Sequence, residues 1–419
     1  EVYWSYPGSM MTSDRDELEG IFEDLCKITP FGRKPELANK LFTEAEAVCS
    51  YAMSQEFGLN SNNMFLGIDV GGSTSDILLI AKNPQNNNRY SLFRESSVRL
   101  AAGVFFDAVK KSEQYRQALV DFHEGHDTAV YVENIKEIID HPDKAPYYLN
   151  SIFDQLKDQN DYDAFYASLS SNAKFVFTIP AYVCGLLLFY SGMLIGKTIK
   201  LNRLGNIDRV ELMPFGKGGR LFHWLRHASS TRTTNEYYNN CVNAGLQLII
   251  PDKAISVKYH EEIENDNKTE VARGLCENNE LAIVDGLNDC DICGETGVRF
   301  IKDGNTYFIA PDDEISGEQF SDDMSYFDFS GVQNFEKFMD IFIKFVSKDT
   351  KLYQRAEDSL RDEISELPTR IISFCTNDQE YKKASKNNKN GEGFHYHQPI
   401  IIAEGACFLK SLISKVFNQ

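Results

Sequence analysis

The segment from Met64 to Lys82, MFLGIDVGGSTSDILLIAK, constrains the fold more than any other part of the sequence. Two apolar runs flank a short polar stretch with Gly71 and Gly72 at its centre, which predicts two strands joined by a tight turn. A turn without Cβ atoms lets backbone N–H groups approach an anion closely, and the hydroxyls of Ser73 and Thr74 add further donors. The segment therefore predicts a hairpin whose turn can bind a phosphate group.

Two aspartates frame this turn, because Asp69 ends the first apolar run and Asp76 opens the second. Two carboxylates would repel a bare phosphate, so they fit the turn only when a divalent cation lies between them. A bound Mg²⁺–phosphate group explains both halves of the motif. An ordinary hairpin with a Gly-Gly turn is the alternative, since Asp and Ser are common turn residues and short motifs produce false positives.

The segments before the hairpin favour the phosphate interpretation. Residues Val2 to Met10 predict a strand, and Thr43 to Gly58 predict a helix that carries Glu44 near its start. A strand, a helix with this glutamate and then DVGGSTSD resemble the second phosphate motif of the actin, heat-shock-chaperone and sugar-kinase ATPase superfamily. The superfamily's first phosphate hairpin would precede Glu1, so we expect this chain alone to bind nucleotide weakly and to hydrolyse it poorly.

The resemblance implies an α/β fold built from ribonuclease-H-like actin/chaperone ATPase lobes, with a helical insertion and an α+β C-terminal extension. It implies ATP or ADP and Mg²⁺ as cofactors. By position, Asp69 would hold Mg²⁺ through water and Asp76 would support the metal shell. Glu44 would orient the attacking water, and the turn from Gly71 to Thr74 would bind the β- and γ-phosphates.

A second glycine-rich corner follows much later in the chain. Residues Val210 to Met213 predict a strand and Leu221 to His227 a helix. The corner between them consists of Gly216, Lys217, Gly218, Gly219 and Arg220. A strand, a glycine turn and a helix N-terminus can hold a nucleotide against backbone N–H groups. The corner resembles the superfamily's adenosine motif, in which Arg220 would stack on adenine; a Walker P-loop is excluded by the spacing, and a plain glycine turn is the alternative.

Two further stretches resemble the same superfamily. Gly103, Phe106 and Asp107 stand where its members have a Gly-Gly-x-x-Phe-Asp segment. The stretch from Lys268 to Gly274 resembles the closing helix of these ATPases, whose small residues allow close packing against the helix that carries Glu44. The alternative for this stretch is a surface helix with a glycine near its end.

These motifs divide the chain into four regions. Residues 1–110 would hold the remainder of the first lobe and the phosphate hairpin, 111–174 a helical insertion, 175–280 the adenosine motif and closing helix, and 281–419 an accessory α+β region. At the end of the last region, PIIIAEGACFLKSLISKVF predicts a strand, a turn at Glu404-Gly405 and a helix. This pattern is a rival for the adenosine motif, although it has one glycine where the corner from Gly216 to Gly219 offers three.

The stretch from Phe175 to Gly196 contains no charged residue and is long enough to cross a membrane. A helix that is buried on all faces of a large α/β core has the same composition. Pro180, Gly185 and Gly192, together with the polar sequence on both sides, favour the buried helix over a membrane anchor.

Composition limits the partners and the compartment. The chain has 419 residues and a net charge of −19, which disfavours binding to nucleic acid or to anionic membranes. The odd number of cysteines, nine, indicates reduced thiols and a cytoplasmic location. We see no signal peptide at the start of the sequence.

Three groups of potential metal ligands carry little weight. The spacing in residues 123–127 (HEGHD) fits no known site, and a solvated helix end explains it better. Cys290 and Cys293 form a single CxxC in an acidic context, which favours structural thiols over zinc or redox chemistry. His395 and His397 lie beside a polar loop and are incidental.

The leading functional hypothesis is an ATP-binding and ATP-hydrolysing module that works as a nucleotide-driven switch, with a protein partner bound through the C-terminal region. The main alternative is a catalytically inactive scaffold of the same fold, and a small-molecule kinase comes third because no sugar-binding signature is evident. Replacing Glu44 and Asp69 together by alanine would separate the first two, since only the enzyme depends on both carboxylates.

Overall fold

A computed structural model describes fourteen ranges and eight single positions of the chain. These are 3–6, 12–28, 42–54, 60–84, 89–125, 175–229, 231–260, 270–276, 282–283, 291–302, 305–314, 327–329, 332–347 and 398–417, with 166, 169, 362, 364, 366, 367, 370 and 371.

A six-stranded mixed sheet with the order β7-β6-β3-β4-β5-β8 forms the centre of the molecule. Its strands are β3 (Asn63–Val70), β4 (Ser75–Asn83), β5 (Arg89–Val98), β6 (Arg209–Phe215), β7 (Ser256–Tyr259) and β8 (Ala282–Ile283). Strands β3, β4 and β5 are antiparallel neighbours, whereas β6 runs parallel to β3, β7 to β6 and β8 to β5. The predicted Gly-Gly hairpin and the predicted strand before the second glycine corner are therefore confirmed, and the fold is mixed α/β.

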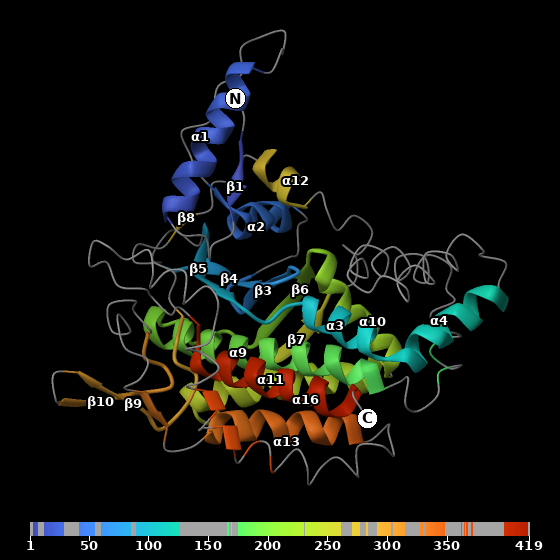
Figure 1. The fold of residues 1–419 in the computed structure, drawn as a ribbon. Helices are drawn as coiled ribbons and strands as arrows, with labels where there is room; N and C mark the ends of the chain where they lie inside the picture. Colours follow the sequence, from blue (N-terminus) through green and yellow to red (C-terminus); the bar gives the residue numbers. More distant parts are fainter. Residues whose placement is uncertain are drawn as a thin grey trace.

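Helices cover both faces of this sheet (Figure 1). The helices of the two layers are α2 (Glu44–Ser54) and α12 (Glu270–Cys276) on one face, and α9 (Thr178–Asn202), α10 (Arg220–Ala228) and α11 (Thr231–Ile249) on the other. Helices α13 (Gln333–Ser347) and α16 (Ile400–Phe417) pack against α9 from the side away from the sheet. Because α9 has helices and the sheet around it, its residues from Thr178 to Gly196 are all buried, and only its last turns reach the surface.

The remaining elements are shorter or lie at the periphery (Figure 1). They are β1 (Ser5–Tyr6), α1 (Thr12–Ile28), β2 (Phe42–Thr43), α3 (Gly103–Lys111), α4 (Glu113–Gly125), the 3-10 turns η2 (Phe175–Phe177) and η3 (Lys217–Gly219), β9 (Val298–Lys302), β10 (Asn305–Ile309) and β11 (Phe327–Phe329). Strands β9 and β10 are antiparallel neighbours in a separate three-stranded sheet with β11.

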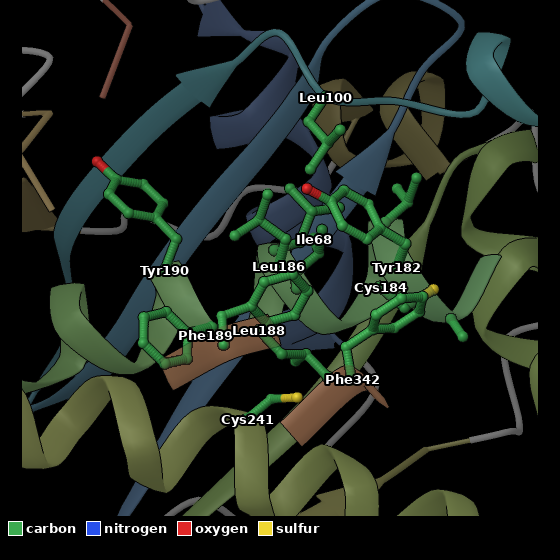
Figure 2. Close-up of a cluster of buried hydrophobic side chains, with 14 of the residues drawn as sticks. Ile68, Leu100, Tyr182, Cys184, Leu186, Leu188, Phe189, Tyr190, Cys241 and Phe342 are labelled. Carbon is green, nitrogen blue, oxygen red and sulfur yellow. The ribbon is translucent and has the colours of Figure 1, made fainter. Parts of the chain in front are cut away.

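Within the described ranges, α9 is the one helix that is long and apolar enough to cross a membrane, and its most apolar stretch is entirely buried inside the protein. Figure 2 shows Leu186 and Leu188 of α9 among side chains from the sheet and from α11 and α13, including Ile68 and Phe342. The prediction of a buried core helix is confirmed.

Glycines allow α9 and α11 to approach each other at backbone distance. A Cβ added at Gly245 of α11 would lie 1.9 Å from the carbonyl oxygen of Phe189, and one added at Gly192 of α9 would lie 2.0 Å from the carbonyl oxygen of Val242. Both separations are far below any van der Waals contact, so a side chain at either position would force the helices apart.

The predicted strand and turn at the C-terminal end are wrong, because α16 is one continuous helix from Ile400. Its isoleucines are buried against the other helices, and this tertiary packing overrides the preference of β-branched residues for strands. Gly405 lies inside the helix rather than in a turn. Its Cβ would be 2.0 Å from Leu186, and Tyr182 donates a hydrogen bond to its carbonyl oxygen at 3.0 Å.

A buried pair of carboxyl groups joins α16 to the start of α13. Glu295 accepts hydrogen bonds from the backbone N–H groups of Asn334 (2.9 Å), Phe335 (2.9 Å) and Thr296 (2.7 Å), which stabilise its ionised form. Glu404 of α16 is fully buried beside it. Burial and the neighbouring Glu295 raise the pKa of Glu404 well above its ordinary value, so Glu404 carries the proton of the pair.

The protein should consequently lose stability as the pH rises toward the raised pKa of Glu404. The folded state binds a proton there that the unfolded state releases above about pH 4.3, so the free energy of unfolding falls by up to about 1.4 kcal/mol per pH unit in that window. The variant Glu404→Gln keeps a neutral donor and should be the more stable protein at about pH 9. Urea unfolding at about pH 6 and pH 9 measures this difference; equal pH slopes in both proteins would show that the pair does not hold a proton.

Some predictions fall outside the described part of the chain. Helix α4 lies at the start of the predicted helical insertion, and this prediction stays open because 126–165 are not described. Cys290, His395 and His397 also lie outside it, as does part of the 123–127 cluster. The seven cysteines whose placement is described are all free thiols, as the composition predicted.

Candidate functional site

The two predicted glycine turns begin at the carboxyl ends of two adjacent parallel strands. In the pairing of β3 with β6, Asp69 lies opposite Phe215. The chain leaves β3 toward β4 and β5 on one side, whereas β6 leads to β7 on the other. In open α/β sheets, ligands bind beyond the carboxyl ends of strands where the direction of the connections reverses. The sheet topology thus points to the same place as the sequence motifs.

The first turn is open to solvent on one side and braced on the other. The Gly71 N–H group donates to the Thr74 carbonyl at 2.8 Å, which closes the turn, and Gly71, Gly72 and Ser73 are exposed. On the inner side, the Gly103 N–H group donates to the Gly72 carbonyl at 2.9 Å. A Cβ at Gly103 would lie 2.4 Å from that oxygen, so only glycine allows the contact between the turn and the start of α3.

The second corner packs directly on the end of β3. Gly216 has a φ of 66°, in the left-handed region, and its Cβ would lie 2.2 Å from Oδ1 of Asp69. A Cβ at Gly218 would lie 2.5 Å from the Val70 carbonyl oxygen and 2.8 Å from the Cβ of Ala102. Because Ala102 and Gly103 also brace the first turn, the two corners meet through one short segment.

Four carboxylates gather near these turns. Asp69 and Asp76 are directly opposite each other on β3 and β4 and so share the face of the sheet that α2 covers. Burial raises the pKa of Asp69 to about 7, with further contributions from Asp76, Glu44 and Glu270. Burial also raises the pKa of Glu44. Such an accumulation of negative charge opposes folding and is typical of a functional site.

Local sequence explains why Glu44 sits there. Thr43 and Glu46 form a capping box at the start of α2. The Thr43 N–H group donates to the Glu46 carboxylate at 2.8 Å, and the Glu46 N–H group donates to the Thr43 hydroxyl at 2.9 Å. This box fixes the first residue of the helix, Glu44, near Asp69. Helix α12 packs across α2 so closely that a Cβ at Gly274 would lie 1.6 Å from the Ala47 carbonyl oxygen, which confirms the predicted contact of these helices.

The residue that follows the second corner, Arg220, opens α10 and is partly buried. Helix α10 is held against α3 by Trp224, whose ring centroid lies 5.4 Å from that of Phe105. Arg220 therefore starts from the same corner as Gly218 and Gly219, as the sequence predicted. The side chains of Phe106 and Asp107 lie outside the described part of the chain.

The donor set fits Mg²⁺ bound mainly through water. Within the described ranges, no three His, Cys, Asp or Glu side chains are grouped so that they could hold a metal ion together. Mg²⁺ commonly keeps several waters and takes only one or two protein carboxylates along with substrate phosphates. Asp69 and Asp76 beside an exposed turn match that requirement, and a cation would offset the repulsion that raises the pKa of Asp69.

A groove of about 360 Å³ lies elsewhere, between α11 and α13. Its lining includes Asn240 and Gln247 on α11 and Lys344 and Phe345 on α13. It shares no residue with either glycine turn. The candidate site is therefore the exposed turn and the carboxylates beside it rather than this groove.

Glu270 lies at the candidate site, although no sequence motif indicated it. Glu270 drew attention only through helix packing, yet its carboxylate is buried and contributes to the raised pKa of Asp69. One feature of the sequence could have indicated Glu270: it lies in the first turn of its helix, as Glu44 lies in the first turn of α2. The roles of all these residues stay predictions, whereas their proximity is a property of the fold.

Comparison with known proteins adds little to this geometry. No model of a protein family and no curated protein matches the sequence. A solved structure titled "PilM-PilN type IV pilus biogenesis complex" aligns with 64% of this chain and 72% of its own, at 11% sequence identity and a TM-score of 0.23. A likeness of this degree carries no argument about function, so the proposal below rests on the site.

Proposed function

We propose that the chain binds and hydrolyses ATP with Mg²⁺, as a ribonuclease-H-like ATPase of the actin and heat-shock-chaperone superfamily, and that it works as a nucleotide-driven switch. The turn from Gly71 to Thr74 would bind the phosphates and Asp69 would hold Mg²⁺ through water. The backbone from Gly216 to Gly219 would approach the nucleotide from the other side, with Arg220 against the base. Glu44 would orient the attacking water.

The observation that carries this proposal is the contact of the two glycine corners around Asp69. Position 216 requires glycine because its φ is positive and because a Cβ there would collide with the Asp69 carboxylate. Position 103 requires glycine because a Cβ there would collide with the Gly72 carbonyl oxygen. Segments more than a hundred residues apart in the chain thus meet around one carboxylate whose pKa is about 7. The pairing of β3 with β6 by itself places the two turns side by side, so the feature that the plain-turn alternatives leave unexplained is the carboxylate with a raised pKa between them.

The chemistry asked of these residues is positioning and neutralisation of charge. The exposed turn offers backbone N–H groups and the hydroxyls of Ser73 and Thr74 to phosphate oxygens. Bound Mg²⁺ would supply charge neutralisation for the phosphates. Glu44 would orient the attacking water and accept a proton from it; burial raises the pKa of Glu44, which makes its carboxylate a stronger base.

Equilibrium titration with a fluorescent ATP analogue tests the proposal. We expect saturable binding with Mg²⁺ that weakens when EDTA removes the cation and that ATP and ADP compete away. Absence of binding at about 1 mM nucleotide, or binding that does not depend on Mg²⁺, would contradict it.

Glu44→Gln should slow ATP hydrolysis about 100-fold or more while nucleotide affinity changes little, because glutamine keeps the size of the side chain but cannot take a proton from water. The measurement is phosphate release in a single turnover. Glu113→Gln is the matched control, since Glu113 is also the first residue of a helix, α4, but is exposed. Equal rates in wild type and Glu44→Gln would rule out the role of Glu44.

An inactive scaffold of the same fold is the second candidate. The glycines have packing roles that a scaffold would need as well, so they do not separate the two functions. The carboxylates do, because their mutual repulsion opposes folding and serves no evident packing purpose. A protein partner for residues 281–419, a cytoplasmic location and a lack of nucleic-acid and membrane binding stay predictions.

A further inference from the structure

We propose that Gln398, at the start of the C-terminal helix α16, is a positioning residue for the phosphate-binding turn. Its side chain reaches the end of β5 from about 300 positions away in the sequence. Oε1 of Gln398 accepts a hydrogen bond from the Arg99 N–H group at 2.6 Å, and Nε2 donates to the Ser97 carbonyl at 3.3 Å. The inference gives the accessory region a function in the proposed ATPase and rests on that proposed function for its effect on nucleotide.

The two hydrogen bonds of Gln398 replace those of a neighbouring strand. A strand beside β5 would accept from one backbone N–H group and donate to a carbonyl two residues earlier, which is the pattern that the amide of Gln398 reproduces. The edge strand β8 pairs with β5 only at Ser91 and Leu92. Gln398 is itself buried, so the contact lies away from competing water.

The segment that Gln398 holds, residues 97–103, also forms hydrogen bonds with the first glycine turn. Ser75, the first residue of β4, donates from its hydroxyl to the Leu100 carbonyl at 2.5 Å. The Ala102 N–H group donates to the Gly71 carbonyl at 3.1 Å, and the next residue braces Gly72 in the same way. Residues 97–103 are thus held by Gln398 on one side and by the turn on the other. A displacement at Arg99 would move the backbone on which the turn rests.

Gln398 is firmly held on its own side. Pro399 follows it and restricts its backbone conformation, and the Pro399 carbonyl accepts from the Ala403 N–H group at 3.0 Å in the first turn of α16. The Ile400 N–H group donates to the Cys293 carbonyl at 2.9 Å, which ties the helix to the accessory region. The backbone that carries the Gln398 side chain is therefore held in place by the start of α16 and by the accessory region.

The consequence for binding follows from this geometry. The exposed turn has few contacts of its own, so its shape depends on the segment behind it. Small displacements of groups that position a substrate reduce rates and affinities far more than they reduce stability. The C-terminal region would in this way set the geometry of the phosphate turn.

Hydrogen exchange of the full chain without nucleotide, together with Mg-ATP titration, tests the proposal. In Gln398→Met, which keeps the side-chain length but loses the amide, the Arg99, Ala102 and Gly103 N–H groups should exchange about tenfold faster and Mg-ATP should bind about tenfold more weakly. Gln398→Glu keeps the acceptor for Arg99 and should restore most of the protection at that position. Lys410→Met, on the exposed side of the same helix, is the control and should match wild type.

Each outcome has a defined meaning. Unchanged exchange at Arg99 and Gly103 in Gln398→Met would overturn the proposal, and so would equal acceleration throughout the core, since that would show a general loss of stability. Faster exchange confined to 97–103 and the turn, in a protein that binds no nucleotide even as wild type, would support the positioning role and refute the ATPase instead.

Discussion

Asp69→Asn should make the protein more stable at about pH 8 and at the same time weaken Mg-ATP binding about 100-fold. Burial and the other acidic side chains around Asp69 raise the pKa of its carboxyl group from the ordinary value of 3.8 to about 7. The contribution of Asp69 to the free energy of unfolding is therefore largest below about pH 4 and falls as the pH rises from about 4 to 7. Asparagine should remove this loss in the free energy of unfolding. The loss is at most about 4 kcal/mol, and we expect about 2 kcal/mol because Asp69 is partly exposed.

Binding would respond in the opposite direction, because asparagine has no charge to offer to hydrated Mg²⁺. Urea unfolding and nucleotide titration on the same preparations measure both effects. Asp208→Asn is the matched control: Asp208 is exposed beside the other end of β6, and its replacement should change neither quantity. A variant Asp69→Asn that loses stability, or that binds Mg-ATP as wild type does, would show that this carboxylate does not belong to a metal-dependent site.

Gly245→Ala should lower the free energy of unfolding by about 3 kcal/mol or more. The added methyl group would lie 1.9 Å from the Phe189 carbonyl oxygen, so α11 and α9 would have to separate along their whole contact. Alanine is the better helix former by about 1 kcal/mol, and the expected loss is what remains after that gain.

The control for Gly245 is a glycine in another helix with free space around it. A Cβ at Gly20 of α1 would meet nothing within 4 Å, so Gly20→Ala should stabilise the protein by about 0.5–1 kcal/mol. Chemical denaturation of both variants measures the contrast. If Gly245→Ala were as stable as wild type, the close packing of α9 on α11 would be incorrect.

Short-range patterns predicted the parts of the fold that depend on neighbours in the chain. The run from Met64 to Lys82 became a hairpin because a turn of glycines joins two apolar strands, and the segment around Gly216 became strand, turn and helix for the same reason. The apolar stretch from Phe175 to Gly196 was predicted as a buried helix because its proline and glycines, and the polar sequence on both sides, did not suit a membrane. These features require no knowledge of distant contacts.

The errors and omissions arose where distant contacts decide. The isoleucines at 400–402 indicate a strand when judged alone, but burial against α9 makes them the start of a helix. The hydrogen bonds of Gln398 to β5 join positions about 300 residues apart and leave no trace in the local sequence. The charge that Glu270 adds near Asp69 likewise depends on how α12 packs across α2. Sequence motifs indicated residues that the fold brings close together, but they could not predict the distant contacts that support them.

The most direct measurement is a crystal structure of the chain with Mg²⁺ and a non-hydrolysable ATP analogue. We expect the phosphates at the turn from Gly71 to Thr74, hydrated Mg²⁺ beside Asp69 and the base next to Arg220. A nucleotide in the groove between α11 and α13, or anywhere that leaves both glycine corners without contact, would contradict it.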